Sequence, residues 1–200
     1  MVEESARRIT DSLIAEGLIA KNLKEWYVYS FIRIIEMTIN VGTILLLSII
    51  FQNTVPTILF LLFFNILRQR TGGFHCNEFW QCYIVTNMLY ALISLLEKNI
   101  VIHGVILWIV AALSAAVIFV VGTVNHPNIS YDMVELRRSK TLARNILSIE
   151  LLVLFFMGAI RIDRVYIYYM SVSIVLCAVL ILLAKVFRQE VNEDENKKNN

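Results

Sequence analysis

The sequence predicts an all-α integral membrane protein with six transmembrane helices and an N-terminal amphipathic segment along the membrane surface. Hydrophobic residues make up 58% of the chain and charged residues only 17%, below the quarter that is usual in soluble domains. The two prolines and seven glycines are too few for a turn-rich β-protein. Long apolar runs alternate with short charged patches, which is the pattern of membrane-spanning helices.

Residues 1–38 are expected to form amphipathic interfacial helices. Apolar residues such as Leu13 and Leu18 recur at helical spacing, with charged residues such as Arg8 and Lys21 between or before them. A helix with one apolar and one charged face lies in the plane of a membrane surface. We therefore expect this segment to rest on the bilayer rather than cross it.

Residues 39–187 are expected to form the six-helix transmembrane domain, followed by a polar cytosolic tail over 188–200. The uncharged run 39–67 is broken near its middle by turn-forming residues from Gln52 to Pro56. We therefore predict two helices joined by a tight hairpin, the first extending back toward Phe31. The other four spans are predicted at 79–96, 100–124, 145–160 and 165–187.

The distribution of Lys and Arg predicts the orientation of these helices. With six spans and a cytosolic N-terminus, fifteen of the eighteen basic residues fall in cytosolic segments. Only Lys98, Arg161 and Arg164 fall outside, which is a strong positive-inside bias. Five spans would weaken the bias, so we predict a multi-pass protein with both termini in the cytosol.

The segment from Arg68 to Cys82 is the most unusual part of the chain. It contains two of the seven glycines, one of the three histidines and two of the three cysteines. Cysteine attacks as a thiolate, which a neighbouring histidine or a helix N-terminus stabilises. On one straight helix His75 and Cys82 would share a face but lie about 10 Å apart. A turn at Gly72-Gly73, with Cys82 in the first turn of the next helix, would bring them together.

An isolated His/Cys pair is more often a helix cap and a packed core residue than a catalytic pair. Here, however, the motif Arg-x-Arg-Thr-Gly-Gly-Phe-His at positions 68–75 is followed seven residues later by Cys82. This pattern resembles the signature of the accessory gene regulator B (AgrB) family. The stretch 124–128 also resembles the family's Asn-Pro-Asn-like loop, and the resemblance covers nearly the whole chain. Departures are Cys76, where the family often has alanine, and His126.

The resemblance implies a quorum-sensing cysteine endopeptidase of the bacterial cell membrane. Its substrate would be a short propeptide with an amphipathic N-terminal helix and an acidic C-terminal tail. His75 would act as general base for Cys82, which would release the tail through an acyl-enzyme thioester. A thiol or hydroxyl of the propeptide would then close a thiolactone or lactone ring.

No cofactor or metal is expected, because His75, Cys76 and Cys82 have no clear fourth zinc ligand. The expected partners are the propeptide and membrane lipids, with no nucleic acid, and a homodimer is left open. A transporter of small peptides or solutes is the main alternative, because Asn65, Asn87 and Glu150 could line a path across the membrane. That function predicts an internal repeat, and the two halves show no convincing similarity.

Weaker candidates for binding the substrate or shaping the site are Arg68, Arg70, Gly72, Gly73, Arg137, Arg138, Lys140 and Glu150. Cytosolic basic side chains set topology and contact lipid headgroups, and they can also attract an acidic peptide tail. Glu150 lies inside a predicted span, where an unpaired carboxylate is costly. It could pair with Arg144, accept a hydrogen bond from Asn87 or Thr86, or orient the site.

Overall fold

The computed structural model describes residues 2–74, 76, 78–100, 104–125 and 132–189. Over these residues the only regular elements are helices, and five of them are long and apolar enough to cross a membrane. The prediction of an all-α integral membrane protein is therefore confirmed. The helices are α1 (Val2–Ala15), the 3-10 turn η1 (Lys21–Leu23), α2 (Lys24–Ile50), α3 (Thr54–Thr71), α4 (Phe79–Asn99), α5 (Gly104–Val121), α6 (Met133–Ala159) and α7 (Arg164–Val186).

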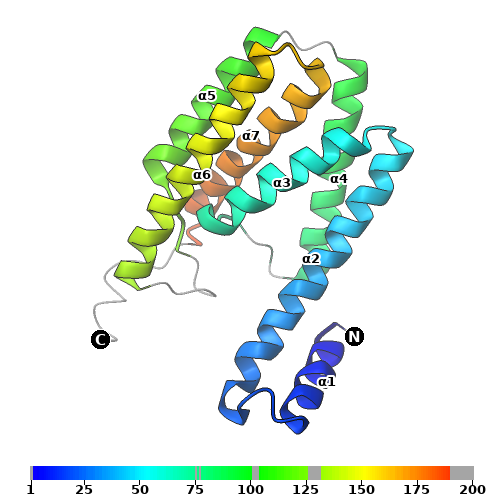
Figure 1. Cartoon of the computed structure of the whole chain (residues 1–200), viewed down its shortest axis with the longest axis vertical. Coiled ribbons are helices and arrows are strands. Elements are labelled where there is room, and N and C mark those ends of the chain that lie inside the picture. Colours follow the sequence, from blue (N-terminus) through cyan, green and yellow to red (C-terminus); the bar gives the residue numbers. More distant parts are fainter. Residues whose placement is uncertain (1, 75, 77, 101–103, 126–131, 190–200) are drawn as a thin grey trace.

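The sixth helix of the bundle is α3, which packs mainly against α7 and α6 (Figure 1). It carries Asn65, Arg68 and Arg70 in its second half, and it does not reach the apolarity of the five candidate spans. Six helices from α2 to α7 thus form the bundle, while the number that cross the membrane completely stays a prediction.

The hairpin predicted between residues 52 and 56 is present. The preceding helix ends at Ile50, and Gln52 adopts a left-handed conformation with φ 53°. The backbone N–H of Asn53 donates to the carbonyl oxygen of Ser48 at 3.0 Å and closes the turn. Pro56 stands in the first turn of α3, where its missing N–H has no helical acceptor to lose.

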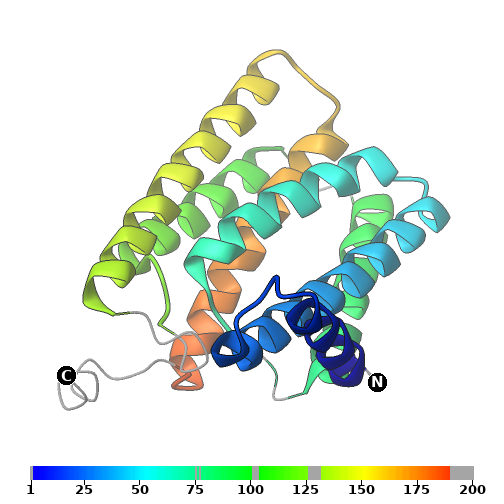
Figure 2. The ribbon, with the colours of Figure 1, turned by 60° about the horizontal axis from the view of Figure 1, so that its bottom comes forward.

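The helix α1 and the first half of α2 form an arm that projects from the bundle, as Figures 1 and 2 show. Ion pairs join Arg7 to Glu25 at 3.3 Å and Lys24 to Asp11 at 2.5 Å, so α1 lies against the start of α2. The second helix runs without a break through position 38. The expected border between the interfacial and spanning parts therefore lies inside a continuous helix, and the interfacial role of 1–38 stays a prediction.

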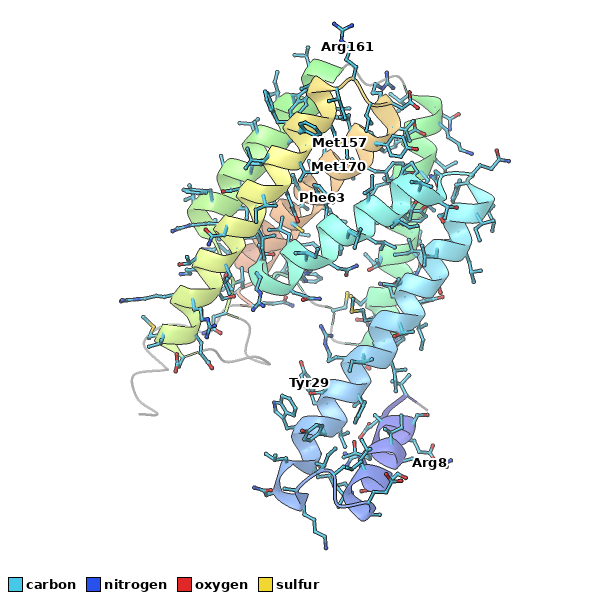
Figure 3. The ribbon with its side chains drawn as sticks, viewed as in Figure 1. Arg8, Tyr29, Phe63, Met157, Arg161 and Met170 are labelled. Atoms are coloured by element: carbon cyan, nitrogen blue, oxygen red, sulfur yellow. The ribbon has the colours of Figure 1, made fainter. Side chains whose placement is uncertain are left out.

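The bundle is centred on α7. Its residues Met170, Ile174 and Ile181 have no exposed surface. Figure 3 shows Phe63 of α3 and Met157 of α6 lying close to Met170, and all three belong to one apolar cluster. The helix that contains most of the core is thus flanked by α3, α5 and α6, with α4 and α2 on the other side of α3 (Figure 1).

A buried hydrogen-bond network joins the α2–α3 hairpin to α4 and α7. The side-chain amide of Asn53 donates to the hydroxyls of Tyr169 and Ser94, and its oxygen accepts from Tyr90 at 3.1 Å. Tyr90 also pairs with Thr57 at 2.7 Å, and Tyr169 donates to Ser94 at 3.0 Å. Between helices in lipid, such bonds are a main source of association because no hydrophobic force drives apolar helices together.

The helix α6 begins earlier than the predicted span. We expected a loop to reach position 144 and a span over 145–160, but the helix starts at Met133. The reason is a capping box: the carboxylate of Asp132 accepts from the N–H of Glu135 at 2.7 Å, and Glu135 accepts from the N–H of Asp132 at 3.2 Å. The basic residues expected in a loop therefore lie on a helix.

Candidate functional site

A double-glycine turn ends α3 and directs the chain toward α4. Gly72 and Gly73 have φ values of +63° and +125°. A Cβ on Gly72 would lie 2.9 Å from the carbonyl oxygen of Val124. A Cβ on Gly73 would lie 2.1 Å from Nη1 of Arg68 and 3.0 Å from the backbone of Leu180. Both the backbone conformation and the space available require glycine at these positions.

Hydrogen bonds from two distant segments hold the last turn of α3. The carbonyl oxygen of Arg70 accepts from the hydroxyl of Thr123 at 2.8 Å and from that of Ser139 at 3.1 Å. The carbonyl oxygen of Thr71 accepts from the N–H of Val124 at 2.9 Å. The end of α3, the chain after α5 and the start of α6 therefore meet at one end of the bundle.

Arg68 and Phe74 fix the far side of the same turn. Arg68 donates from Nη2 to the carbonyl oxygen of Phe74 at 2.6 Å, and the N–H of Phe74 donates to the carbonyl oxygen of Leu180 at 2.8 Å. The ring of Phe74 packs against Phe187, with centroids 5.3 Å apart. Sequence patterns did not reveal these contacts, because Leu180 and Phe187 lie more than a hundred residues away and resemble any other apolar residue of α7.

Cys82 stands in the first turn of α4, as predicted. Its N–H donates to the carbonyl oxygen of Glu78 at 3.4 Å, and its side chain is half-buried. The guanidinium of Arg68 is close enough to the thiols of Cys177 and Cys82 to interact with both electrostatically. Nη1 of Arg68 is buried and has no hydrogen-bond partner among the described residues. The structure therefore brings a positive charge, a free donor and a thiol together beside the glycine turn.

Cys76 lies at the site, although the sequence assigned it no role there. It follows the glycine turn, is half-buried, and its thiol makes a hydrogen bond with that of Cys82. Burial, followed by the negative charge and the hydrogen bond of Cys82, raises the pKa of Cys76 above its ordinary value. The third cysteine, Cys177, is completely buried in α7 and donates to the carbonyl oxygen of Phe64 at 3.8 Å.

His75 and the motif residues 126–128 lie outside the described residues. The pairing of His75 with Cys82 therefore stays a prediction. The turn at Gly72-Gly73 and the place of Cys82 in the first turn of α4 are present as expected.

The candidate basic residues gather near the end of α3. The side chains of Arg70, Arg137 and Arg138 are exposed, whereas Lys140 is half-buried with its stem against Gly122. Because Ser139 contacts the carbonyl oxygen of Arg70, the basic residues at the start of α6 are brought close to α3. They form a positive surface at the end of the bundle that also holds the glycine turn.

Glu150 does not have the partners proposed for it. It is 5% exposed, and neither carboxylate oxygen accepts a hydrogen bond from any described residue. Arg144 instead donates from Nε to the carbonyl oxygen of Phe119 at 3.0 Å and stacks on its ring. Asn87 donates its amide to Asn40 at 3.1 Å. The pairings of Glu150 with Arg144, Asn87 and Thr86 are therefore wrong, because the Glu150 carboxylate is buried and none of these three side chains donates to it.

The fold and these contacts define a multi-helix membrane protein that holds a half-buried cysteine beside an arginine at one end of its bundle. The family model described as accessory gene regulator B (AgrB) matches residues 6–188, so the chain belongs to the AgrB family. This confirms the resemblance found in the sequence and gives the chain a role in quorum-sensing peptide processing, in a family that generally consists of processing proteases. No curated protein and no solved structure shows a significant match to the chain.

Proposed function

We propose that this protein is a membrane-embedded cysteine endopeptidase that removes the C-terminal tail from a quorum-sensing propeptide and promotes its macrocyclisation. One observation supports the proposal above all others. Cys82 is half-buried at the start of α4, beside the charge of Arg68. A helix N-terminus and a neighbouring cation both favour a thiolate, which is the nucleophilic form of cysteine.

In the first step, the sulfur of Cys82 attacks the carbonyl carbon of the bond between the peptide core and its tail. The C–N bond breaks, and an acyl-enzyme thioester forms. His75, in the role that the family resemblance implies, takes the thiol proton and returns it to the leaving amine. The free Nη1 of Arg68 would be the donor that stabilises negative charge on the carbonyl oxygen.

In the second step, a thiol within the propeptide attacks the thioester carbonyl. The bond from that carbonyl to the sulfur of Cys82 breaks, the proton passes to Cys82, and a thiolactone ring closes; a serine hydroxyl would give a lactone. Exchange between two thioesters is nearly level in energy, so departure of the tail must drive the sequence forward. Water must be excluded meanwhile, which a site at the end of a membrane bundle favours.

The positive surface formed by Arg70, Arg137, Arg138 and Lys140 supports an acidic tail as the leaving segment. Clustered positive side chains attract an acidic peptide, and the range of that attraction depends on ionic strength. The same residues suit the positive-inside rule, so the proposed arrangement places this end of the bundle in the cytosol of a bacterial cell. One set of side chains would then serve topology and substrate attraction together.

The test is cleavage of the cognate propeptide in membranes that contain both chains, followed by mass spectrometry of the products. Cys82→Ala should abolish both the released tail and the acyl-enzyme adduct. His75→Ala should lower the catalytic rate without preventing propeptide binding, because a proton-transfer role belongs to the transition state. Cys177→Ala is the matched control and should leave cleavage largely intact, since that thiol has no exposed surface for a peptide to reach. Undiminished cleavage by Cys82→Ala would refute the assignment.

A further inference from the structure

Cys76 and Cys82 form a pair of thiols in direct contact. Both are reduced and half-buried, and a side-chain hydrogen bond joins them. The two cysteines differ in backbone conformation. Cys82 is held by the first turn of α4, whereas Cys76 lies in no helix. The cleavage mechanism uses only Cys82, which leaves the neighbouring thiol without a role.

Contact between the two thiols is the first requirement for a disulfide. A disulfide needs Cα atoms about 4.4–6.8 Å apart and sulfur atoms about 2 Å apart. Thiols already in hydrogen-bond contact reach that state by rotating their side chains and by a small shift of one backbone. Cys76 can make that shift because no helical hydrogen bonds fix its backbone. Cys177 cannot replace Cys76 as the partner of Cys82, because the Cys177 thiol is completely buried and hydrogen-bonded to the carbonyl oxygen of Phe64.

The surroundings also give the two sulfurs different chemical roles. Cys82 stands in the first turn of α4 within electrostatic range of Arg68, and it is the thiolate form of cysteine that oxidants attack. The raised pKa of Cys76 keeps its own thiol protonated and hydrogen-bonded to that sulfur. If Cys82 is oxidised, the Cys76 thiol therefore lies next to the oxidised sulfur and can react with it.

We propose that Cys76 is a resolving thiol, and that a hydroperoxide joins it to Cys82 in a reversible disulfide at the site. First the Cys82 sulfur attacks the peroxide, the O–O bond breaks, and Cys82 becomes a sulfenic acid while the peroxide leaves as water (or an alcohol). The Cys76 sulfur then attacks the Cys82 sulfur. The S–S bond forms, the S–O bond breaks, and the hydroxyl leaves with the Cys76 proton as water. Two thiols lose two electrons and one peroxide gains them.

This disulfide would switch peptide processing off and protect the nucleophile. Bonded sulfur cannot attack a peptide bond, so activity would stop until a thiol reductant restores it. Without a resolving thiol, a sulfenic acid is exposed to further oxidation to the sulfinic acid, which is irreversible in most proteins. The loss of activity rests on the proposed function of Cys82, but the disulfide itself does not.

The bond is tested by peptide mapping of the full-length protein in detergent or liposomes after treatment with hydrogen peroxide. Trypsin cleaves after Arg70, and glutamyl endopeptidase cleaves after Glu78 and Glu97, so the two cysteines fall on peptides 71–78 and 79–97. Oxidation should leave these peptides joined, with a mass lower by two hydrogens than their sum, and a reductant should separate them. If they stay separate while Cys82 is oxidised, the proposal is overturned, whatever the enzyme's activity.

The switch is tested with Cys76→Ala, Cys76→Ser and Cys177→Ala. After peroxide, the unmodified protein and Cys177→Ala should lose propeptide cleavage and regain most of it with dithiothreitol. The two Cys76 variants should lose it irreversibly, with sulfinic acid at Cys82. Full recovery in both Cys76 variants would exclude Cys76 as the resolving thiol. If cleavage never depends on Cys82 although the joined peptides form, then the proposed function fails and the disulfide stands.

Discussion

Gly73→Ala should disable the site without unfolding the bundle. The residue adopts φ +125°, a conformation that costs an L-residue about 1–3 kcal/mol. The new Cβ would also lie 2.1 Å from Nη1 of Arg68 and 3.0 Å from the backbone of Leu180. The arginine can move but the backbone cannot, so the guanidinium must leave the position from which it holds Phe74.

The size of the expected loss of activity follows from the free-energy cost of the backbone conformation at residue 73. If Gly73→Ala destabilises the native turn by about 1–3 kcal/mol relative to other conformations, the fraction of molecules with a correctly formed turn falls by roughly 5- to 150-fold. We expect kcat/KM for propeptide cleavage to fall within that range. Displacement of Arg68 from the Cys82 thiol should place the effect toward its upper end.

The assay is single-turnover cleavage by purified protein in liposomes, with thermal unfolding followed in parallel. Gly42→Ala is the matched control, because a Cβ there meets nothing within 4 Å in the middle of α2. It should leave cleavage unchanged and add about 0.5–1 kcal/mol to helix stability. The reasoning fails if Gly73→Ala cleaves as fast as Gly42→Ala, or if it loses activity only in proportion to unfolded protein.

Three further predictions concern charge and orientation. Neutralising Arg137 and Arg138 together should raise the apparent KM while leaving the catalytic rate intact, and high salt should do the same to the unmodified enzyme. If neither the substitutions nor salt changes the KM, these residues serve topology alone. Glu150→Gln should raise the unfolding temperature by about 2–4 °C for each kcal/mol of relieved carboxylate burial, measured by a thermal melt in detergent, and a lower melting temperature would reveal a partner. In protein whose native cysteines are replaced, a single cysteine at Asn99 should react with an impermeant reagent on intact cells and one at Thr141 should not; the reverse pattern would overturn the orientation.

The elements that local sequence determines were predictable. Turn-forming residues between Gln52 and Pro56 interrupt an uncharged run, and the helices do end and begin there. The glycine pair ahead of Cys82 likewise predicted a turn and a new helix, and both are present. In each case the signal lies within a few residues of the structure that it produces.

The features that the sequence concealed depend on distant contacts or on a competing local signal. The capping box of Asp132 and Glu135 is hidden in the sequence because the basic residues after it suggest a loop, although arginine is a good helix former. Arg144, an expected partner of Glu150, lies six residues before it on the same helix, but packing turns Arg144 toward Phe119. The contact between Cys76 and Cys82 depends on the path of the loop, which no periodicity encodes.

The buried network around Asn53 has a consequence for the position of Cys82 along the axis of the bundle. Tyr90 belongs to that network and to the same helix as Cys82, eight residues further along. At 1.5 Å per residue the sulfur-bearing position stands about 12 Å along the axis from the network. Because these interhelical hydrogen bonds fix the axial register of α4 against α3 and α7, the single amide of Asn53 sets how far along the bundle Cys82 stands.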